Sequence, residues 1–175
     1  MPVPLEIRTA RLCLRRLTTA HLSDLVELDS DPEVMRYISN GEPNSRERYE
    51  DVLLPRMLAW DHEPYGFLAA YDAETEAFVG WFHLRPTVAP GETMLELGYR
   101  LRRSAWGMGL ATEGSRALVR YAFDELDQAA VDACADPRNA ASIHVMEKCG
   151  MRFAGTFVHP RVPIEVVRYL VERSR

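Results

Sequence analysis

The spacing of hydrophobic positions changes along the first third of the chain. Residues 5–17 alternate between apolar and polar side chains, which predicts a first strand. Residues 18–38 place leucines at helical spacing behind a pair of threonines, either of which can cap a helix. A second helix is predicted over residues 45–60, and Pro55 should kink or divide it.

The remaining two thirds alternate between strand and helix patterns. Two aromatic and aliphatic runs flank the turn-like segment 72–76, which predicts a hairpin. Gly98 interrupts a strand pattern at 93–101 and indicates a bulge or a close backbone approach. The other predicted elements are a helix over 108–126, a strand over 129–135, a helix over 136–150 that Asn139 caps and Gly150 ends, and strands over 151–158 and 164–172. This order predicts a mixed α+β fold.

Composition excludes several classes of protein. The 175 residues are 47% apolar, which fits one globular domain over residues 1–175. No apolar run approaches the roughly 18 residues that a membrane span needs, and the start lacks the apolar stretch of a secretory signal. We therefore expect a cytoplasmic protein without a membrane partner.

The net charge and the spacing of possible metal ligands limit which partners and sites we expect. A net charge of -5 argues against a nucleic-acid partner and suits a cationic substrate. Acidic residues of the first two helices could attract such a substrate or could simply be solvated; they are Asp29, Asp31, Glu33 and Asp51. Cys13, Cys134 and Cys149 have no C-x-x-C spacing, and the five histidines form no H-x-x-x-H pattern, so we expect no metal site.

The segment SAWGMGLATEG (104–114) places Gly107 and Gly109 directly before a predicted helix. One interpretation is a tight strand-to-helix turn. The other is a phosphate site, because glycines let an anion approach the free N–H groups at the positive end of a helix. The segment is neither the G-x-G-x-x-G dinucleotide fingerprint nor a P-loop, so a different phosphate-bearing ligand is required.

The segments LELGYRLRRSAWGMGLATEG and DPRNAASIHVMEKCGMRFAGTF together resemble the core of the GCN5-related N-acetyltransferases (GNAT). TARLCLRRLT and FVGWFHL are similar to the branch that includes the Rim-type ribosomal-protein N-terminal acetyltransferases. The resemblance implies a central mixed sheet of about six to seven strands, flanked by about four helices. That sheet would splay open between the strands around Glu96 and Val131, and acetyl-CoA would bind in the gap.

The resemblance also implies which residues contact the cosubstrate. Backbone groups of β-strand residues would pair with the pantetheine arm, and the amides from Arg103 to Ala111 would hold the diphosphate. The implied contacts are Tyr99, Arg100, Leu101, Arg102, Arg103, Trp106, Gly107, Met108, Gly109, Leu110, Ala111, Thr112, Asn139 and Ser142. The family turn often begins with Gln or Arg three positions before the first glycine, where this chain has Ser104. Trp106 either packs the turn against the sheet or stacks on adenine.

Acetyl transfer from a thioester to an amine needs a neutral amine and a proton for the leaving thiolate. By resemblance, Glu96 takes the amine proton and Ser142 protonates the thiolate. The alternation of apolar and polar residues in this strand is equally consistent with a Glu96 side chain that points to solvent. Ser142 could likewise be an ordinary residue in the first turn of a helix. Tyr99 is a nearby hydroxyl expected to pack or to touch the cosubstrate.

These observations predict an acetyl-CoA-dependent N-acetyltransferase that acts on a primary amine by direct attack, with a protein or peptide N-terminus as the expected acceptor. Two alternatives stay open. One is an enzyme for a small amine such as a polyamine, an aminoglycoside or an amino-acid derivative. The other is a non-catalytic acyl-CoA-binding sensor. By resemblance, a homodimer is possible.

Overall fold

The computed structural model describes residues 3–38 and 41–174. Its centre is an eight-stranded sheet in the order β1-β2-β3-β4-β5-β6-β8-β7. The strands are β1 (Glu6–Arg8), β2 (Leu12–Arg16), β3 (Gly66–Asp72), β4 (Phe78–Pro86), β5 (Leu95–Leu101), β6 (Ala130–Ala135), β7 (Arg152–Val158) and β8 (Glu165–Glu172). β5 and β6 are parallel, and all other neighbours are antiparallel. The predicted mixed fold is confirmed, with one strand more than expected because residues 5–17 form a hairpin of two strands.

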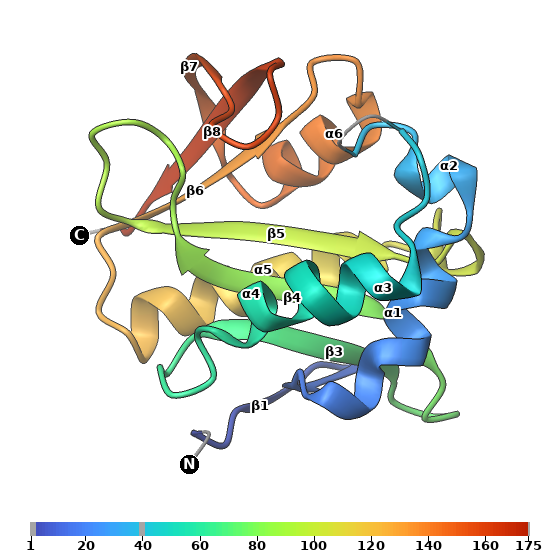
Figure 1. The fold of residues 1–175 in the computed structure, drawn as a ribbon. Coiled ribbons are helices and arrows are strands. Elements are labelled where there is room, and N and C mark those ends of the chain that lie inside the picture. Colours follow the sequence, from blue (N-terminus) through green and yellow to red (C-terminus); the bar gives the residue numbers. More distant parts are fainter. Residues whose placement is uncertain (1–2, 39–40, 175) are drawn as a thin grey trace.

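The helices lie on both faces of the sheet (Figure 1). They are α1 (Leu22–Asp29), α2 (Pro32–Met35), α3 (Arg46–Arg48), α4 (Leu54–Leu58), α5 (Leu110–Asp124) and α6 (Ala140–Lys148). The second predicted helix is divided into α3, a π-helical turn over Tyr49–Leu53 and α4, and Pro55 is the second residue of α4. No helix in the described ranges combines the length and the apolar character needed to cross a bilayer.

Alternation along β4 gives the sheet two separate apolar faces. Phe82 and Leu84 pack in one buried cluster with Leu118 of α5. Trp81 points the other way and packs in a second buried cluster with residues of α1 and the π-helical turn, among them Leu25 and Tyr49. The sheet is therefore covered by α5 on one side and by the α1–α4 layer on the other, as Figure 1 shows.

The parallel pair β5–β6 is the irregular point of the sheet. Only Leu95 with Val131 and Glu96 with Asp132 are paired across it, although both strands continue beyond these residues. Between Leu97 and Leu101, the described part of β5 has no partner strand on the β6 side. The expected splay therefore opens directly after Glu96, and it exposes a strand edge inside the molecule.

Candidate active site

A cavity of about 390 Å³ occupies the splay between β5 and β6. Tyr99, Asn139 and Ser142 line it on the side of α6, and Trp81 and His83 of β4 line it on the side of the α1–α4 layer. This volume lies in the range of small-molecule sites. Hydroxyl and amide side chains line one side of the cavity, and aromatic and imidazole rings line the other.

The glycine turn adopts the backbone conformation that its sequence requires. Gly107 has φ +72° and Gly109 has φ +78°, a left-handed region that other residues rarely adopt. Gly109 is the N-cap of α5. Arg11, in the β1–β2 turn, donates from Nη1 to the Met108 carbonyl at 2.7 Å and pairs through Nε with Glu113 Oε2 at 2.7 Å. The turn is thus tied to the edge hairpin of the sheet.

The backbone N–H groups of this turn point away from protein acceptors. None of the six consecutive N–H groups from Gly107 to Thr112 donates a hydrogen bond to a described residue. Earlier in the turn, Ala105 and Trp106 donate to the carbonyls of Arg102 and Arg103, so those two amides are already used. The uninterrupted run of donors open to a ligand therefore begins at Gly107, and it includes the free first turn of α5.

Several side chains near the turn are engaged elsewhere. Arg100 pairs with Asp29 at 2.6 Å, Arg102 with Glu27 at 2.6 Å and Arg103 with Asp31 at 3.0 Å. Leu101 and Leu110 are buried in the core on the α5 side. These side chains therefore already have partners within the protein.

Trp106 is 46% exposed, so the indole covers the turn only in part. Its Nε1 donates to the Leu101 carbonyl at 2.9 Å, which fixes the ring against the end of β5.

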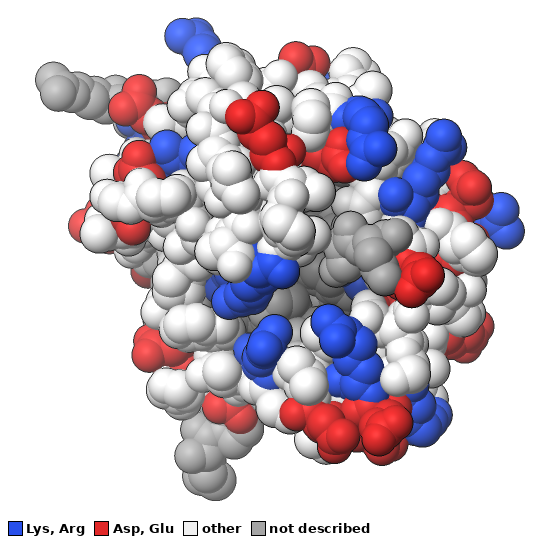
Figure 2. Space-filling view, turned by 45° about the horizontal axis from the view of Figure 1, so that its top comes forward, with Lys and Arg blue, Asp and Glu red and all other residues white. Residues whose placement is uncertain are grey.

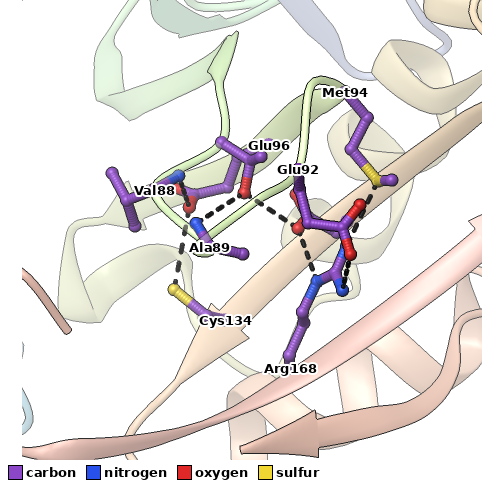
Figure 3. Close-up of polar contacts among 9 residues, drawn as sticks. Val88, Ala89, Glu92, Met94, Glu96, Cys134 and Arg168 are labelled. Carbon is purple, nitrogen blue, oxygen red and sulfur yellow. Dashed lines mark hydrogen bonds and ion pairs between the residues drawn. The ribbon is translucent and has the colours of Figure 1, made fainter. Parts of the chain in front are cut away.

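Glu96 lies at the point where the two strands separate. Its carboxylate is buried at 4% exposure on the face of the α1–α4 layer and lines the cavity. Oε1 accepts a hydrogen bond from Arg85 Nη2 at 2.6 Å. Oε2 lies 3.5 Å from the backbone nitrogen of Val88 and 3.8 Å from the thiol of Cys134 (Figure 3). The alternative in which Glu96 points to solvent is therefore not what the fold adopts.

Three pKa values around Glu96 are displaced from their ordinary range. Burial raises the pKa of Glu96, but His83 and the Arg85 guanidinium outweigh this effect and hold it below its usual value. Burial lowers the pKa of His83 to about 4, so that ring is neutral at pH 7. Burial and the charge of Glu96 raise the pKa of the Cys134 thiol, which stays protonated. The site thus holds an ionised carboxylate, a neutral imidazole and an unreactive thiol.

His83 is a buried polar side chain beside the cavity. Its Nε2 lies 3.5 Å from Glu96 Oε1, yet neither ring nitrogen hydrogen-bonds to a described residue. Its ring stacks on Trp81 with centroids 5.7 Å apart. A Cβ at Gly98 would meet His83 Cε1 at 2.4 Å, so the glycine that interrupts the β5 pattern permits a close approach rather than a bulge.

A hydroxyl pair lies on the opposite wall of the cavity. Tyr99 donates to Ser142 Oγ at 3.3 Å, and burial raises the pKa of Tyr99, which keeps the phenol protonated. Asn139 caps α6 as predicted, because its Oδ1 accepts from the Ser142 backbone nitrogen at 3.1 Å. Ser142 receives a hydrogen bond from Tyr99, so its own proton can go to a ligand.

A polar network outside the cavity holds the place where β5 and β6 separate. Arg168 of β8 donates to Asp132 at 2.7 Å and pairs with Glu92 at 2.8 Å (Figure 3). Thr87 donates to the same Asp132 carboxylate at 2.9 Å. These contacts tie β6, β8 and the β4–β5 loop together, which holds the splay open at a defined place.

The structure brings Glu96, Tyr99, Asn139 and Ser142, which the family resemblance named, to one cavity, and other residues that line it were not predicted. His83 and Arg85 share a face with Trp81 through the alternation of β4, a signal that could have found them. Cys134 approaches Glu96 across a parallel strand pair. No local pattern reveals that contact.

Comparison with known proteins agrees with this geometry. Residues 11–152 match the model of the acetyltransferase (GNAT) domain family. The chain is 34% identical over 181 residues to the FsC-acetyl coenzyme A-N(2)-transacetylase of Aspergillus fumigatus, covering 96% of this chain and 76% of that protein. It is similar to the crystal structure of a GNAT-family acetyltransferase from Bacillus anthracis, with a TM-score of 0.79, 25% identity and coverage of 96% and 98%.

The fold is also that of RimL, the ribosomal L7/L12 α-N-protein acetyltransferase, solved in complex with coenzyme A. That likeness has a TM-score of 0.78 at 15% identity, covering 96% of this chain and 98% of RimL. The chain belongs to the GNAT family. It is an N-acetyltransferase that uses acetyl-CoA as its cosubstrate.

Proposed function

We propose that this enzyme acetylates the free α-amine of a peptide or protein N-terminus, and that the whole chain acts as one catalytic domain. One sheet that includes strands from Glu6 to Glu172 supports the single domain. The quoted GNAT motifs and the order of elements support a place near the Rim-type branch.

The observation that carries the proposed acceptor is the ion pair between Glu96 and Arg85. A carboxylate whose charge is offset and whose pKa is lowered is a weak base, so it suits an amine that gives up its proton readily. At pH 7 an α-amine with a pKa near 8 is neutral about a tenth of the time, whereas a lysine amine is neutral about once in 2,500. The site therefore favours α-amines.

In this proposal the amine enters from the face of the α1–α4 layer, where Glu96 accepts its proton. Bound acetyl-CoA supplies an activated acetyl thioester. On the opposite wall, Ser142 donates a proton to the departing sulfur, and the hydrogen bond from Tyr99 holds the serine hydroxyl in place. Cys134 stays a protonated thiol beside Glu96, which favours direct attack by the amine over an acetylated cysteine.

The remaining cosubstrate contacts belong to the backbone. The six N–H groups from Gly107 to Thr112 suit a diphosphate, since each charge-assisted hydrogen bond contributes roughly 1.5 to 3 kcal/mol. The unpaired edge of β5 from Leu97 to Leu101 suits an extended amide-bearing arm, which would pair as a further strand does. Tyr99 and Asn139 would flank that arm.

A second candidate acceptor is a small amine. The 34% identity to the Aspergillus fumigatus enzyme favours it, because the name of that protein assigns its transfer to an N(2) nitrogen.

An acceptor screen that detects released coenzyme A thiol separates these functions. It should compare a peptide with a free α-amine, the same peptide blocked at its N-terminus but carrying a lysine, and a set of small amines. We expect thiol release with the free α-amine and little with the blocked peptide. Release with small amines alone would overturn the peptide acceptor. Saturable acetyl-CoA binding without release for any amine would indicate a sensor.

A further inference from the structure

The cavity is lined by more positive than negative side chains, although the chain carries a net charge of -5. Five arginines line it, against the two acidic residues Glu96 and Asp136. Figure 2 shows Lys and Arg side chains gathered around a hollow on one face of the molecule. The local field at the acceptor side is therefore opposite in sign to the charge of the whole protein.

The ion pairs leave three of these arginines without a counter-charge. Arg85 pairs with Glu96 and Arg100 with Asp29, and Asp136 is paired with an arginine outside the lining. Within the described residues, the guanidinium groups of Arg48, Arg56 and Arg161 make no hydrogen bond or ion pair.

Two of the three unpaired arginines reach the cavity that contains Glu96 from separate segments. Arg56 is on α4, and Arg161 is in the β7–β8 loop. All three of Arg56, Arg85 and Arg161 line one cavity, and burial together with the charges of Arg85 and Arg56 lowers the pKa of Arg161. We call Arg56, Arg85 and Arg161 the basic rim. Like charges gathered without an anion destabilise the folded protein, and a bound anion relieves this repulsion.

The diphosphate of the cosubstrate does not account for the basic rim. Glu96 stands near the start of β5, whereas the open N–H groups begin beyond its other end. Leu101 is five positions after Glu96, which is about 16 Å along β5. The anion that the rim attracts must therefore enter with the acceptor.

We propose that the acceptor is an acidic peptide N-terminus, whose carboxylate side chains bind Arg56 and Arg161 while its α-amine reaches Glu96. This inference rests on the proposed function. Arginine suits the role because its planar guanidinium donates two parallel hydrogen bonds to a carboxylate. Glu96 does not repel such a peptide strongly, since Arg85 already offsets its charge.

None of the four acidic residues named from the sequence, Asp29, Asp31, Glu33 and Asp51, lines the cavity. Asp29 is 0% exposed and is bound by Arg100, Tyr49 and Asn44, so it cannot attract a substrate. The expectation of a cationic substrate, drawn from net charge, thus has no support at the cavity.

The test uses three peptides with the same first residue and with glutamate, glutamine or lysine at the second and third positions. We expect kcat/KM to be about tenfold or more higher for the glutamate peptide than for the glutamine peptide, and lowest for the lysine peptide. Raising the salt concentration should reduce this preference. The net negative charge of the protein would produce the opposite order, so long-range attraction cannot mimic the result.

Variants of the basic rim test whether Arg56 and Arg161 cause the preference for the glutamate peptide. Arg56→Gln and Arg161→Gln each remove no side-chain hydrogen bond or ion pair among the described residues. We expect each to lower kcat/KM for the glutamate peptide about tenfold more than for the glutamine peptide. Arg152→Gln, on the exposed part of β7, is the matched control and should keep the ratio of the two substrates.

Equal kcat/KM for the glutamate and glutamine peptides, or an unchanged ratio in both rim variants, would overturn the acidic acceptor while leaving α-amine acetylation intact. Absence of thiol release with every peptide would instead overturn the proposed function. The two failures are therefore distinguishable.

Discussion

Arg85 Nη2 lies 2.6 Å from Glu96 Oε1, and both side chains are almost completely buried. The ion pair has two consequences for Glu96, the proposed base. It keeps the carboxylate ionised in a buried place, and it lowers the affinity of that carboxylate for a proton. Catalysis then relies mainly on bringing amine and thioester together, since orientation can supply effective molarities of about 10⁵ to 10⁸ M.

Glu96→Gln should lower kcat at neutral pH by about 10²-fold, the lower end of the range for a positioned base. The deficit should shrink as the pH rises toward about 9.5, because more of the amine is then neutral without help. Initial rates of the wild type and the variant across this range provide the measurement. Glu172→Gln, an exposed carboxylate at the end of β8, is the control. Parallel pH profiles for wild type and Glu96→Gln would remove Glu96 from the proton transfer.

The hydrogen bond from Tyr99 to Ser142 leads to a prediction about the leaving group. If Ser142 protonates the departing thiolate, Ser142→Ala should lower kcat by about 10²-fold with acetyl-CoA. An acetyl thioester of a more acidic thiol needs less help, so the loss should be smaller with that donor. Tyr99→Phe should have a weaker effect in the same direction. A loss for Ser142→Ala that is the same with both donors would argue against this role. Ser174→Ala, at an exposed position after β8, serves as the control.

Arg11 should act on cosubstrate affinity through the glycine turn. Arg11→Ala removes the hydrogen bond to the Met108 carbonyl and the pair with Glu113, so the turn loses its tie to the sheet. We expect the Kd for coenzyme A to rise about tenfold, as for one lost charged hydrogen bond. Titration calorimetry measures this effect. Arg8→Ala, which removes an exposed ion pair with Glu6, should leave the Kd unchanged. Equal affinities for both variants would show that the turn holds its shape without Arg11.

His83 should make the stability of the folded protein depend on pH. Its pKa is lowered from 6.5 to about 4, so the unfolded chain takes up a proton at a higher pH than the folded protein does. This contribution is fully present above pH 6.5 and is lost as the pH falls toward 4. It amounts to about 3 kcal/mol at most.

Urea unfolding at several pH values tests this dependence on His83. His83→Gln should show a flatter decline between pH 6.5 and 4 than the wild type. His144→Gln changes an exposed ring and should follow the wild type. A decline of equal steepness in His83→Gln would assign the effect to other groups, such as His159, whose pKa is also lowered by burial.

Local patterns were sufficient to predict most elements, because helix and strand spacing reflect burial on one side of a segment. The caps show this well. Asn139 accepts a hydrogen bond from the Ser142 backbone N–H, and Pro55 lies in the first turn of α4, where its missing N–H costs no hydrogen bond within α4. The first segment was predicted as one strand because the turn between β1 and β2 carries no glycine or proline. The alternation continues on both sides of it.

The composition of the site was harder to predict, because it depends on contacts between distant segments. Glu96 and Arg85 face each other only through the register of β4 with β5. Arg161 comes to the same place from a loop some 65 residues further along the chain, and nothing in its neighbours indicates this position. Net charge does not predict the charge of the cavity lining for the same reason, since it averages over the whole protein.

The most direct test of the central claim is calorimetric titration of coenzyme A into Gly109→Val. A side chain at Gly109 should block the approach of the diphosphate to the free N–H groups of α5 and lower the affinity by about 10²-fold or more. Gly91 has the same φ of +78° in the β4–β5 loop, with no atom within 4 Å of an added Cβ. Gly91→Val therefore carries the same backbone strain and should bind coenzyme A as the wild type does. Wild-type affinity in a folded Gly109→Val protein would contradict the account.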